Sequence, residues 1–366
     1  MLQRSESFRA AVTAIEYYLP ETVVTNAELA AQFPDWEVEK LAEKTGIRER
    51  HIASPCQCSS DLAACAAQQL FDSGQVTQAD IDVILLCTQS PDYFLPTTAC
   101  ILQHRLGLRT SIAALDFNLG CSGFVYGLGI AKGLIESAQA RCVLLLTAET
   151  YSKFIDTADR SVRVLFGDAA AATIIEAVPS ESGELYIESP VWGTDGRGAP
   201  NLCVPGGAAR ASMRSAASAS GPGLPTGPAN PCRLVMNGPE VFNFTAQRVP
   251  EMVGEVLRRY GKVTADVDLF VFHQASKLLL DHLRRKLQIP PERFYTAMED
   301  CGNTVSSTIP IALKRASAEG VLKPGDLVLL AGFGVGYSWA GTLIRWLGSE
   351  AVRSGRKSIA RGAINE

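Results

Sequence analysis

Short apolar runs alternate with amphipathic stretches along almost the whole chain, and this alternation predicts an α/β protein. Apolar runs such as 83–87 and 142–147 are typical of buried strands. In the first half we expect strands at 10–18, 83–87, 112–117 and 142–147, and helices at 59–73, 97–106 and 122–137. Strands that alternate with helices of this length indicate crossover connections and a largely parallel sheet covered on both faces.

The second half of the chain follows the same rhythm. We expect helices at 239–260, 277–287 and 308–319, and strands at 269–272, 327–331 and 338–346. Two halves with one rhythm suggest an internally duplicated α/β core, although no repeat is visible residue by residue. We therefore expect a first half over 1–178 and a second over 179–348, with a Gly-, Ala-, Ser- and Pro-rich surface loop at 205–232 and a solvated basic extension over 349–366.

Composition narrows the class of protein. The chain has 366 residues, 47% of them hydrophobic, which is enough for about two globular domains. The net charge of −4 argues against a nucleic-acid or anionic-membrane surface, and no apolar stretch approaches the ~18 residues that span a bilayer. Ten scattered cysteines and no signal-like N-terminal segment indicate reduced thiols in the cytoplasm. Cys56 and Cys58 lack a second ligand pair at zinc spacing, so we expect no metal site.

Cys121 is the first candidate for chemistry. The apolar run that ends at Phe117 is followed by the small-residue turn Asn118-Leu-Gly-Cys121-Ser-Gly, where a helix is expected to begin. A thiolate at a helix N-terminus faces unpaired backbone N–H groups, which should lower its pKa and favour the reactive anion. The alternative is one buried thiol among ten.

His273 and Asn303 favour the functional interpretation of Cys121. His273 stands at the exit of the 269–272 strand, and Asn303 lies in a small-residue turn before a helix, while the other three histidines show no such context. Together they form a set suited to acyl transfer, with a thiolate nucleophile and hydrogen-bond donors for an oxyanion. The glycine-rich segment 331–336 leads into another strand, so it is a weak phosphate motif; it either donates backbone N–H groups to a site or is simply a glycine-rich turn at a sheet corner.

These motifs together resemble a known family. The segments are Asn118-Leu-Gly-Cys121-Ser-Gly-Phe, His273-Gln-Ala, Gly302-Asn303-Thr and Gly332-Phe-Gly-Val-Gly, supported by 45–52, 166–171 and 236–242. In this order, and over about residues 10 to 347, the chain resembles the ketoacyl-ACP synthase III family of the thiolase-like superfamily.

The resemblance implies a thiolase fold of two pseudo-repeated halves in a layered α-β-α-β-α core, a homodimer, and a ping-pong decarboxylative Claisen condensation. Cys121 would attack an acyl thioester, with the backbone N–H groups of Cys121 and Val335 forming the oxyanion hole. His273 and Asn303 would then donate hydrogen bonds to the thioester oxygen of malonyl-ACP. The implied substrates are acyl-CoA and the malonyl acyl carrier protein, without a metal or redox cofactor.

Substrate-binding candidates also come from the resemblance. Trp36 and Arg160 correspond to residues that sandwich the coenzyme A adenine, although Trp36 lies farther from the 45–52 motif than in the family. Phe166 belongs to a matching motif. Phe94 and Leu95 fall in the segment that, in the family, reaches across the dimer and closes the partner's acyl pocket. They are either the residues that set chain length or simply part of the interface core.

The carrier-docking positions depart from the family. Leu278 and Asn243 stand where an Arg and a Lys are usual. Lys277 and the basic run 284–286 could substitute, because an acidic carrier needs a positive surface more than one fixed residue. An ordinary solvated helix face is an equal alternative for this run. The departures favour a specialised relative that uses medium-chain or secondary-metabolite acyl groups.

Other functions remain open on sequence grounds. Transfer of the Cys121-bound acyl group to an oxygen or nitrogen nucleophile is the closest rival. A type III polyketide synthase typically has Pro where Val335 stands, and a non-catalytic chain-length partner usually lacks the nucleophile. A non-decarboxylative enzyme would need a carboxylate base near the acyl pocket, for which Asp92 is the nearest candidate.

Overall fold

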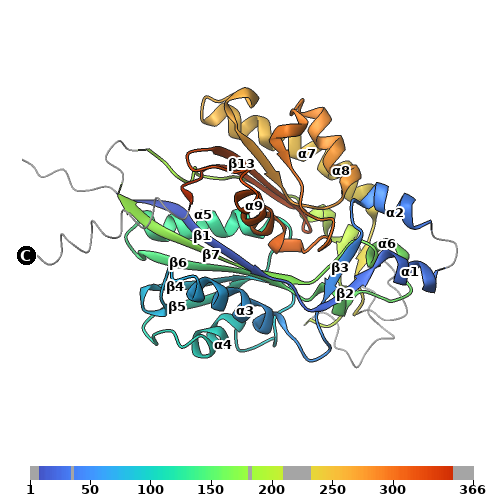
Figure 1. Cartoon of the computed structure of the whole chain (residues 1–366), viewed down its shortest axis with the longest axis horizontal. Helices are drawn as coiled ribbons and strands as arrows, with labels where there is room; N and C mark the ends of the chain where they lie inside the picture. Colours follow the sequence, from blue (N-terminus) through green and yellow to red (C-terminus); the bar gives the residue numbers. More distant parts are fainter. Residues whose placement is uncertain (1–7, 34–36, 180–183, 209–231, 349–366) are drawn as a thin grey trace, which may run out of the picture.

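The computed structural model describes residues 8–33, 37–179, 184–208 and 232–348 (Figure 1). Trp36, the extension 349–366 and most of the expected 205–232 loop lie outside these residues. Within the described part of the chain, no helix combines the length and the apolar character that crossing a membrane would need.

Two five-stranded sheets form the framework of the molecule. The first has the order β1-β7-β6-β4-β5 and the second the order β12-β11-β13-β14-β8. The strands of the first sheet are β1 (Phe8–Tyr18), β4 (Val83–Cys87), β5 (Ala113–Phe117), β6 (Cys142–Glu149) and β7 (Ala169–Pro179). Those of the second are β8 (Val191–Thr194), β11 (Leu269–Phe272), β12 (Phe294–Tyr295), β13 (Leu327–Gly334) and β14 (Ser338–Arg345).

The two sheets share one topology. If the strands of each sheet are numbered by their order within that sheet, both sheets have the order 1-5-4-2-3. The second strand pairs in parallel with the third and fourth, and the fifth runs antiparallel to the first and fourth. The duplication expected from the sequence is therefore present in the strand connections.

The sheets are mixed, so the prediction of a largely parallel sheet was wrong. Two of the four strand pairings in each sheet are antiparallel, because the fifth strand returns beside the fourth. The clearest case is the β13–β14 hairpin, in which Gly334 pairs with Ser338 across a tight turn. Antiparallel neighbours can be joined by so short a connection, whereas parallel ones need a crossover.

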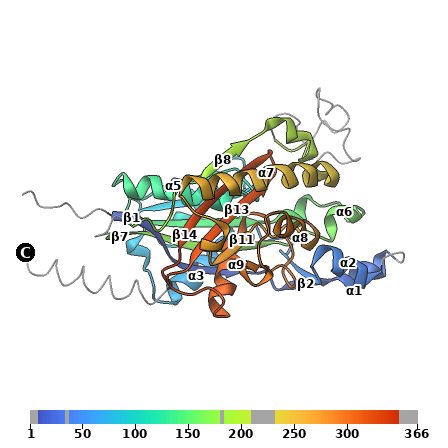
Figure 2. The ribbon, with the colours of Figure 1, turned by 90° about the horizontal axis from the view of Figure 1, so that it is seen from above.

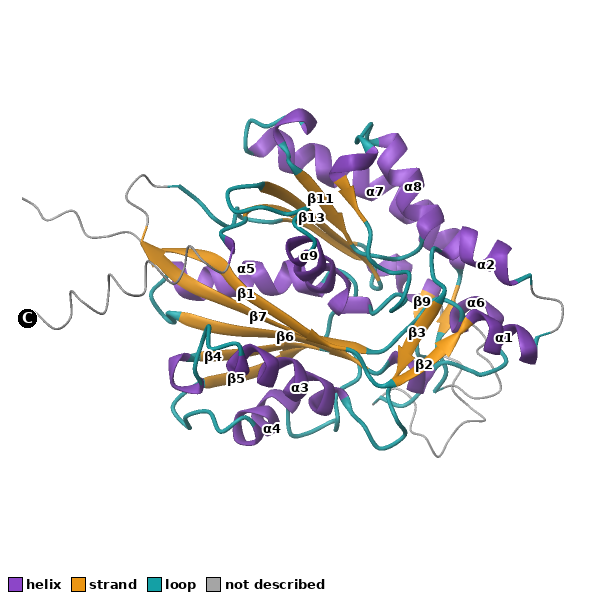
Figure 3. Ribbon diagram, viewed as in Figure 1, coloured by secondary structure: helices purple, strands orange, loops and turns teal. Residues whose placement is uncertain are grey.

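Helices cover the sheets in three layers (Figure 3). They are α3 (Ser59–Asp72) and α4 (Thr98–Arg105) outside the first sheet, α5 (Gly123–Glu136) and α9 (Thr308–Ala318) between the sheets, and α7 (Gly238–Arg259) and α8 (Lys277–Lys286) outside the second. The view from above shows α7 lying across β13 and β14 (Figure 2). Along β4, Ile84 and Leu86 pack with the outer layer, and Val83 and Leu85 with the central one. This alternation, set by the two-residue period of a strand, produces the five-layered core.

Smaller elements lie at the end of the molecule that carries α1 and α2. They are β2 (Thr22–Thr25), α1 (Asn26–Gln32), α2 (Val38–Thr45), β3 (Glu49–Ile52), α6 (Arg160–Arg163), β9 (Leu202–Cys203) and β10 (Val235–Met236). Thr25 caps α1 and exchanges hydrogen bonds with Glu28 in a capping box.

Candidate active site

Cys121 lies in the turn between β5 and α5, as the sequence predicted. Its side chain is buried in an apolar cluster that also contains Tyr151, Phe166 and Val305. The cluster joins residues of both halves of the chain, because Val305 comes from the turn before α9. Cys121 therefore sits where the two halves meet.

The end of β13 packs directly against Cys121. A Cβ atom on Gly334 would lie 2.8 Å from the Cys121 sulfur, and one on Gly332 would lie 2.9 Å from the Cys121 backbone oxygen. These glycines are within the strand and not in a turn, so the expected end of this strand at residue 331 was too early. Glycine is needed at both positions, because a side chain at 334 would displace the thiol and one at 332 would meet the backbone of Cys121 and Ser122. The backbone N–H of Val335, directly beyond, donates to the Cys121 sulfur.

The structure contradicts the expected lowering of the Cys121 pKa. Burial raises the pKa of Cys121 to about 12, and the nearby Glu149 carboxyl acts in the same direction. The N–H groups of Val335 and of Cys121 itself lower this pKa, but they do not offset the burial. The resting residue is therefore a neutral thiol, whose proton must be removed during attack.

His273 comes directly after β11 and extends the sheet. Its backbone N–H donates to the Ala331 oxygen at 2.8 Å, and its ring meets the Phe333 ring edge-on at 5.6 Å. The ring nitrogen Nδ1 lies 2.8 Å from Oγ1 of Thr308, and the ring also donates to the backbone oxygen of Val305. Burial lowers the pKa of His273 to about 3, so its imidazole is neutral at physiological pH.

Asn303 occupies a tight turn in front of α9. Its side-chain oxygen accepts a hydrogen bond from the Val305 N–H at 2.9 Å, which turns the amide NH₂ group the other way. Among the described residues, that NH₂ group makes one long contact, at 3.5 Å to the Ala275 oxygen. The backbone of Asn303 bonds to both neighbours of Phe166, since its N–H donates to Leu165 and its oxygen accepts from Gly167. Asn303 thus has an N–H donor available beside the cluster that holds Cys121.

The other substrate-binding candidates lie at separate places. Phe166 is buried in the Cys121 cluster, with its ring centroid 5.2 Å from that of Tyr151. Arg160 begins α6, and its guanidinium lies over the Phe33 ring at 4.7 Å. Phe33 precedes Trp36, which lies outside the described residues, by three positions in the sequence. Phe94 and Leu95 are 79% and 82% exposed, so neither touches the cluster within one copy of the chain.

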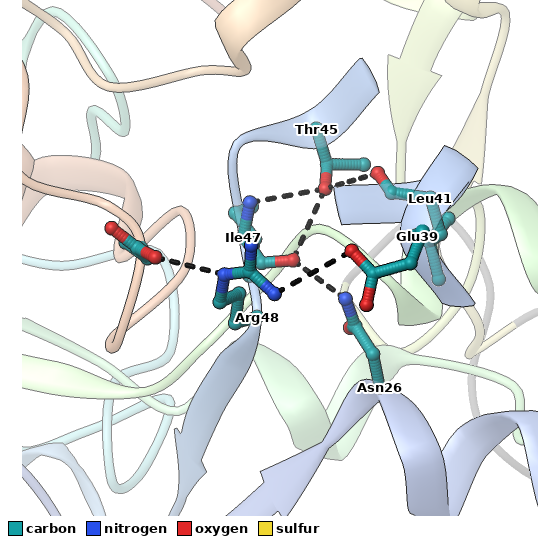
Figure 4. Close-up of polar contacts among 7 residues, drawn as sticks. Asn26, Glu39, Leu41, Thr45, Ile47 and Arg48 are labelled. Atoms are coloured by element: carbon teal, nitrogen blue, oxygen red, sulfur yellow. Dashed lines mark hydrogen bonds and ion pairs between the residues drawn. The ribbon is translucent and has the colours of Figure 1, made fainter. Parts of the chain in front are cut away.

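The 45–52 motif joins the two halves at the surface (Figure 4). Arg48 donates to Glu299 of the second half at 2.9 Å, and its guanidinium lies 3.8 Å from Glu39. Behind it, the Asn26 amide donates to the Ile47 oxygen at 2.7 Å, and Thr45 also bonds this segment. In this structure the motif links α2, the Asn26 side chain and the second half of the chain through these polar contacts.

Two polar residues near Cys121 were missed by the sequence reasoning. Glu149, the last residue of β6, is completely buried, and the Tyr151 hydroxyl donates to the Gln89 side chain at 2.6 Å. A charged residue at the end of an apolar run gave a weak signal at most. Asp92, the other acid considered, accepts from the Ser60 N–H at the start of α3 and is held there.

None of the ten cysteines forms a disulfide bond in the structure. Among the described residues, no group of three or more His, Cys, Asp and Glu side chains is arranged to hold a metal ion.

The duplicated sheets, the five layers and the cysteine at their junction define a thiolase-fold enzyme. Residues 115–196 match the model of the 3-oxoacyl-[acyl-carrier-protein (ACP)] synthase III family, and residues 257–346 match the model of its C-terminal part. The beta-ketoacyl-[acyl-carrier-protein] synthase III of Caldanaerobacter subterraneus subsp. tengcongensis is 36% identical over 93% of this chain and 99% of its own length. The chain belongs to the 3-oxoacyl-ACP synthase III family.

Solved structures agree with this assignment. A crystal structure of a 3-oxoacyl-(acyl-carrier-protein) synthase III superposes with a TM-score of 0.87 and 50% identity, over 92% of this chain and all of that one. The priming β-ketosynthase of the R1128 polyketide biosynthetic pathway gives a TM-score of 0.83 at 29% identity, over 95% of this chain and 99% of that one.

Proposed function

We propose that this protein condenses an acyl thioester, loaded on Cys121, with malonyl-ACP and releases carbon dioxide and a 3-oxoacyl product. The observation that carries the proposal is the meeting of three groups at the junction of the halves. The end of β13 touches both Cys121 and His273, and Val305 bonds to both His273 and Asn303.

In the first half-reaction the Cys121 sulfur attacks the carbonyl carbon of an acyl-CoA. The N–H groups of Cys121 and Val335 hold the resulting oxyanion, a role supported by the bond from Val335 to the sulfur. The neutral imidazole of His273 is available to take the thiol proton and return it to the departing coenzyme A thiolate. The acyl group is then joined to Cys121 as a thioester.

In the second half-reaction the malonyl thioester loses carbon dioxide. The electron pair of the broken C–C bond forms an enolate, whose oxygen accepts hydrogen bonds from the Asn303 amide and from His273 with its proton on Nε2. In the structure the Thr308 hydroxyl donates to the Val305 oxygen at 3.1 Å and accepts from Nδ1; turning this hydroxyl toward Nδ1 would give the tautomer with its proton on Nε2. The carbanion attacks the acyl carbon, and the Cys121 thiolate leaves and takes up a proton from solvent to restore the resting thiol. No metal or redox cofactor takes part.

The binding surfaces supporting this proposal lie on different elements. The Arg160–Phe33 pair supports coenzyme A binding, because an aromatic ring and a guanidinium both stack on adenine. On α8, Lys277 is paired with Asp281, which leaves Arg285 and Lys286 exposed to attract an acidic carrier protein. With such substrates, the cytoplasm is the compartment in which we expect the reaction.

A homodimer is part of the proposal. β5 is an edge strand of the first sheet, and it exposes Leu115, with 40% of the residue accessible. An apolar edge of this kind invites pairing with another strand. We propose that a second copy pairs along β5, which would let the exposed Phe94 and Leu95 reach the partner's acyl pocket.

Intact-protein mass tests the proposal. The enzyme is incubated with acyl-CoA thioesters from acetyl to dodecanoyl and then chased with malonyl-ACP, with Cys121→Ala as control. We expect an acyl adduct that depends on Cys121 and leaves as a 3-oxoacyl product. An adduct that survives the malonyl chase but transfers to an alcohol or amine would replace condensation by the simpler acyl transfer.

A further inference from the structure

Glu149 is a buried carboxyl group that the proposed reaction does not use. It is fully enclosed, and its oxygens accept hydrogen bonds from the Gln89 N–H at 3.0 Å, the Ser90 hydroxyl at 3.2 Å and the Ser306 hydroxyl at 2.9 Å. All three partners are neutral. Burying a carboxyl group among neutral donors costs folding free energy, which indicates that Glu149 has a structural or functional role.

Ser306 connects this carboxyl to the catalytic turn. It lies in the 3₁₀ turn Val305–Ser307, shortly after Asn303. The Val305 N–H fixes the Asn303 oxygen, and the Val305 oxygen accepts at 3.1 Å from the Thr308 hydroxyl, which meets Nδ1 of His273, so this one segment orients both groups. Val305 has a φ of 56°, a strained value for a β-branched residue. Such a conformation persists only where surrounding contacts hold it.

The contacts that hold the turn come from the other half of the chain. Glu149 binds Ser306, and two residues earlier on β6 the Thr147 hydroxyl meets the Ser307 hydroxyl at 2.9 Å. Ser307 also donates to the Thr147 backbone oxygen at 3.2 Å. The end of β6 therefore holds the Val305–Ser307 turn at two points, through Glu149 and through Thr147.

On its opposite side, Glu149 holds the segment beside the nucleophile. The Gln89 backbone bonds to the carboxyl, while its side-chain amide donates to Asn118 at 3.2 Å and lies against Gly120. A Cβ on Gly120 would be 2.4 Å from the Gln89 amide oxygen. One carboxyl group thus links the chain that leads to Cys121 with the turn that carries Asn303.

We propose that Glu149 is a positioning residue that aligns Asn303, and through Val305 also His273, for the malonyl half-reaction. This inference rests on the proposed function. Glu149 contacts no substrate; it fixes the Val305–Ser307 turn relative to Cys121. Its loss should therefore affect decarboxylation more than acyl loading, because His273 acts in both half-reactions whereas Asn303 acts only on the malonyl thioester.

The test measures the two half-reactions separately in the full-length protein. Acyl loading is followed by intact mass, and decarboxylation by carbon dioxide release from malonyl-ACP. For Glu149→Ala we expect the ratio of decarboxylation rate to loading rate to fall about tenfold or more, since small misplacements of catalytic groups carry such costs. Glu149→Gln retains an oxygen for Ser306 and should recover most of the ratio.

Ser306→Ala removes the same link while leaving Glu149 bonded to Gln89 and Ser90. It should lower the ratio in the same direction, and it carries the test if Glu149→Ala does not fold. The double variant should be no worse than Glu149→Ala, because residues that act through one contact are not additive. Asp82→Asn is the matched control: this carboxyl accepts from the N–H groups of Arg141 and Cys142, at the opposite end of β6 from Glu149, so its loss should leave the ratio unchanged.

The outcomes separate this inference from the proposed function. If the wild-type enzyme releases no carbon dioxide from malonyl-ACP, the proposed condensation fails, and the role of Glu149 fails with it. If the wild type does so, and both Glu149→Ala and Ser306→Ala keep the wild-type ratio, only the positioning role is overturned. Equal loss of both half-reactions in these variants would likewise reduce Glu149 to a structural residue.

Discussion

The two halves of this chain share one strand topology but carry different residues at the ends of equivalent strands. In each half a turn joins the third strand to a central helix, and this turn carries Cys121 in the first half and Asn303 in the second. After the second strand, the first half has Thr88 where the second has His273. A duplicated framework therefore brings equivalent positions to one junction, and divergence at those positions separates the proposed nucleophile from the proposed hydrogen-bond donors.

In both halves the candidate catalytic side chain is uncharged in the resting protein. Burial keeps both Cys121 and His273 uncharged, since it raises the pKa of the thiol and lowers the pKa of the imidazole. A site of neutral groups can accept an apolar acyl chain without desolvating an ion. Charge then develops only during the reaction, next to N–H groups already in place.

The largest expected effects come from removing one candidate catalytic side chain from each half in turn. Cys121→Ala should abolish acyl loading yet retain decarboxylation of malonyl-ACP, because the donors of the second half remain. Asn303→Ala should do the reverse and lower decarboxylation by roughly 10²- to 10³-fold, the usual cost of removing one oxyanion donor. Loading by mass and carbon dioxide release measure the two effects. Loss of both half-reactions in either variant would contradict this division.

Gly334→Ala tests the contact between the halves. Its new Cβ would lie 2.8 Å from the Cys121 sulfur, so we expect acyl loading to fall by about 10²-fold. Gly254→Ala on α7 is the matched control, because a Cβ there meets nothing within 4 Å. Loading rates of the two variants and their thermal unfolding provide the comparison. Wild-type loading in Gly334→Ala would show that β13 tolerates a side chain beside the nucleophile.

The alkylation rate of Cys121 reports its protonation. Because the pKa of this thiol is raised to about 12, the thiolate fraction should grow about tenfold with each pH unit between pH 7 and 9. The measurement is the rate of iodoacetamide labelling of the Cys121 peptide by mass spectrometry. His273 should not alter this slope, since its pKa of about 3 keeps it neutral throughout. A labelling rate that levels off within this range would mean that the pKa of Cys121 is lowered, as first expected for a helix N-terminus.

The sequence predicted many of the elements because their signals are local, but it did not predict the strands β7, β8 and β12. The strand Val83–Cys87 and the strand Leu269–Phe272 have the bounds that their apolar runs indicated. Three features depended on contacts between distant segments and were missed. The antiparallel return of β7 and β14, the burial that raises the Cys121 pKa, and the hydrogen bonds of Glu149 all arise from tertiary packing. Glu149, for example, has partners near residues 89 and 306 that no local pattern relates.

The smallest expected effects concern the binding surfaces, one supplied by each half. Phe33→Ala removes the ring under Arg160 and should raise the KM for acyl-CoA a few-fold, since an exposed cation–π contact contributes about 0.5–1 kcal/mol. Arg285→Glu on α8 should instead raise the KM for malonyl-ACP and leave that for acyl-CoA unchanged. For Phe33→Ala the control substrate is acyl-pantetheine, which lacks the adenine. If Phe33→Ala weakens acyl-pantetheine equally, the ring supports the fold of α1 and not the nucleotide. If Arg285→Glu leaves both constants unchanged, the carrier docks elsewhere, and the basic end of α8 is an ordinary solvated helix face.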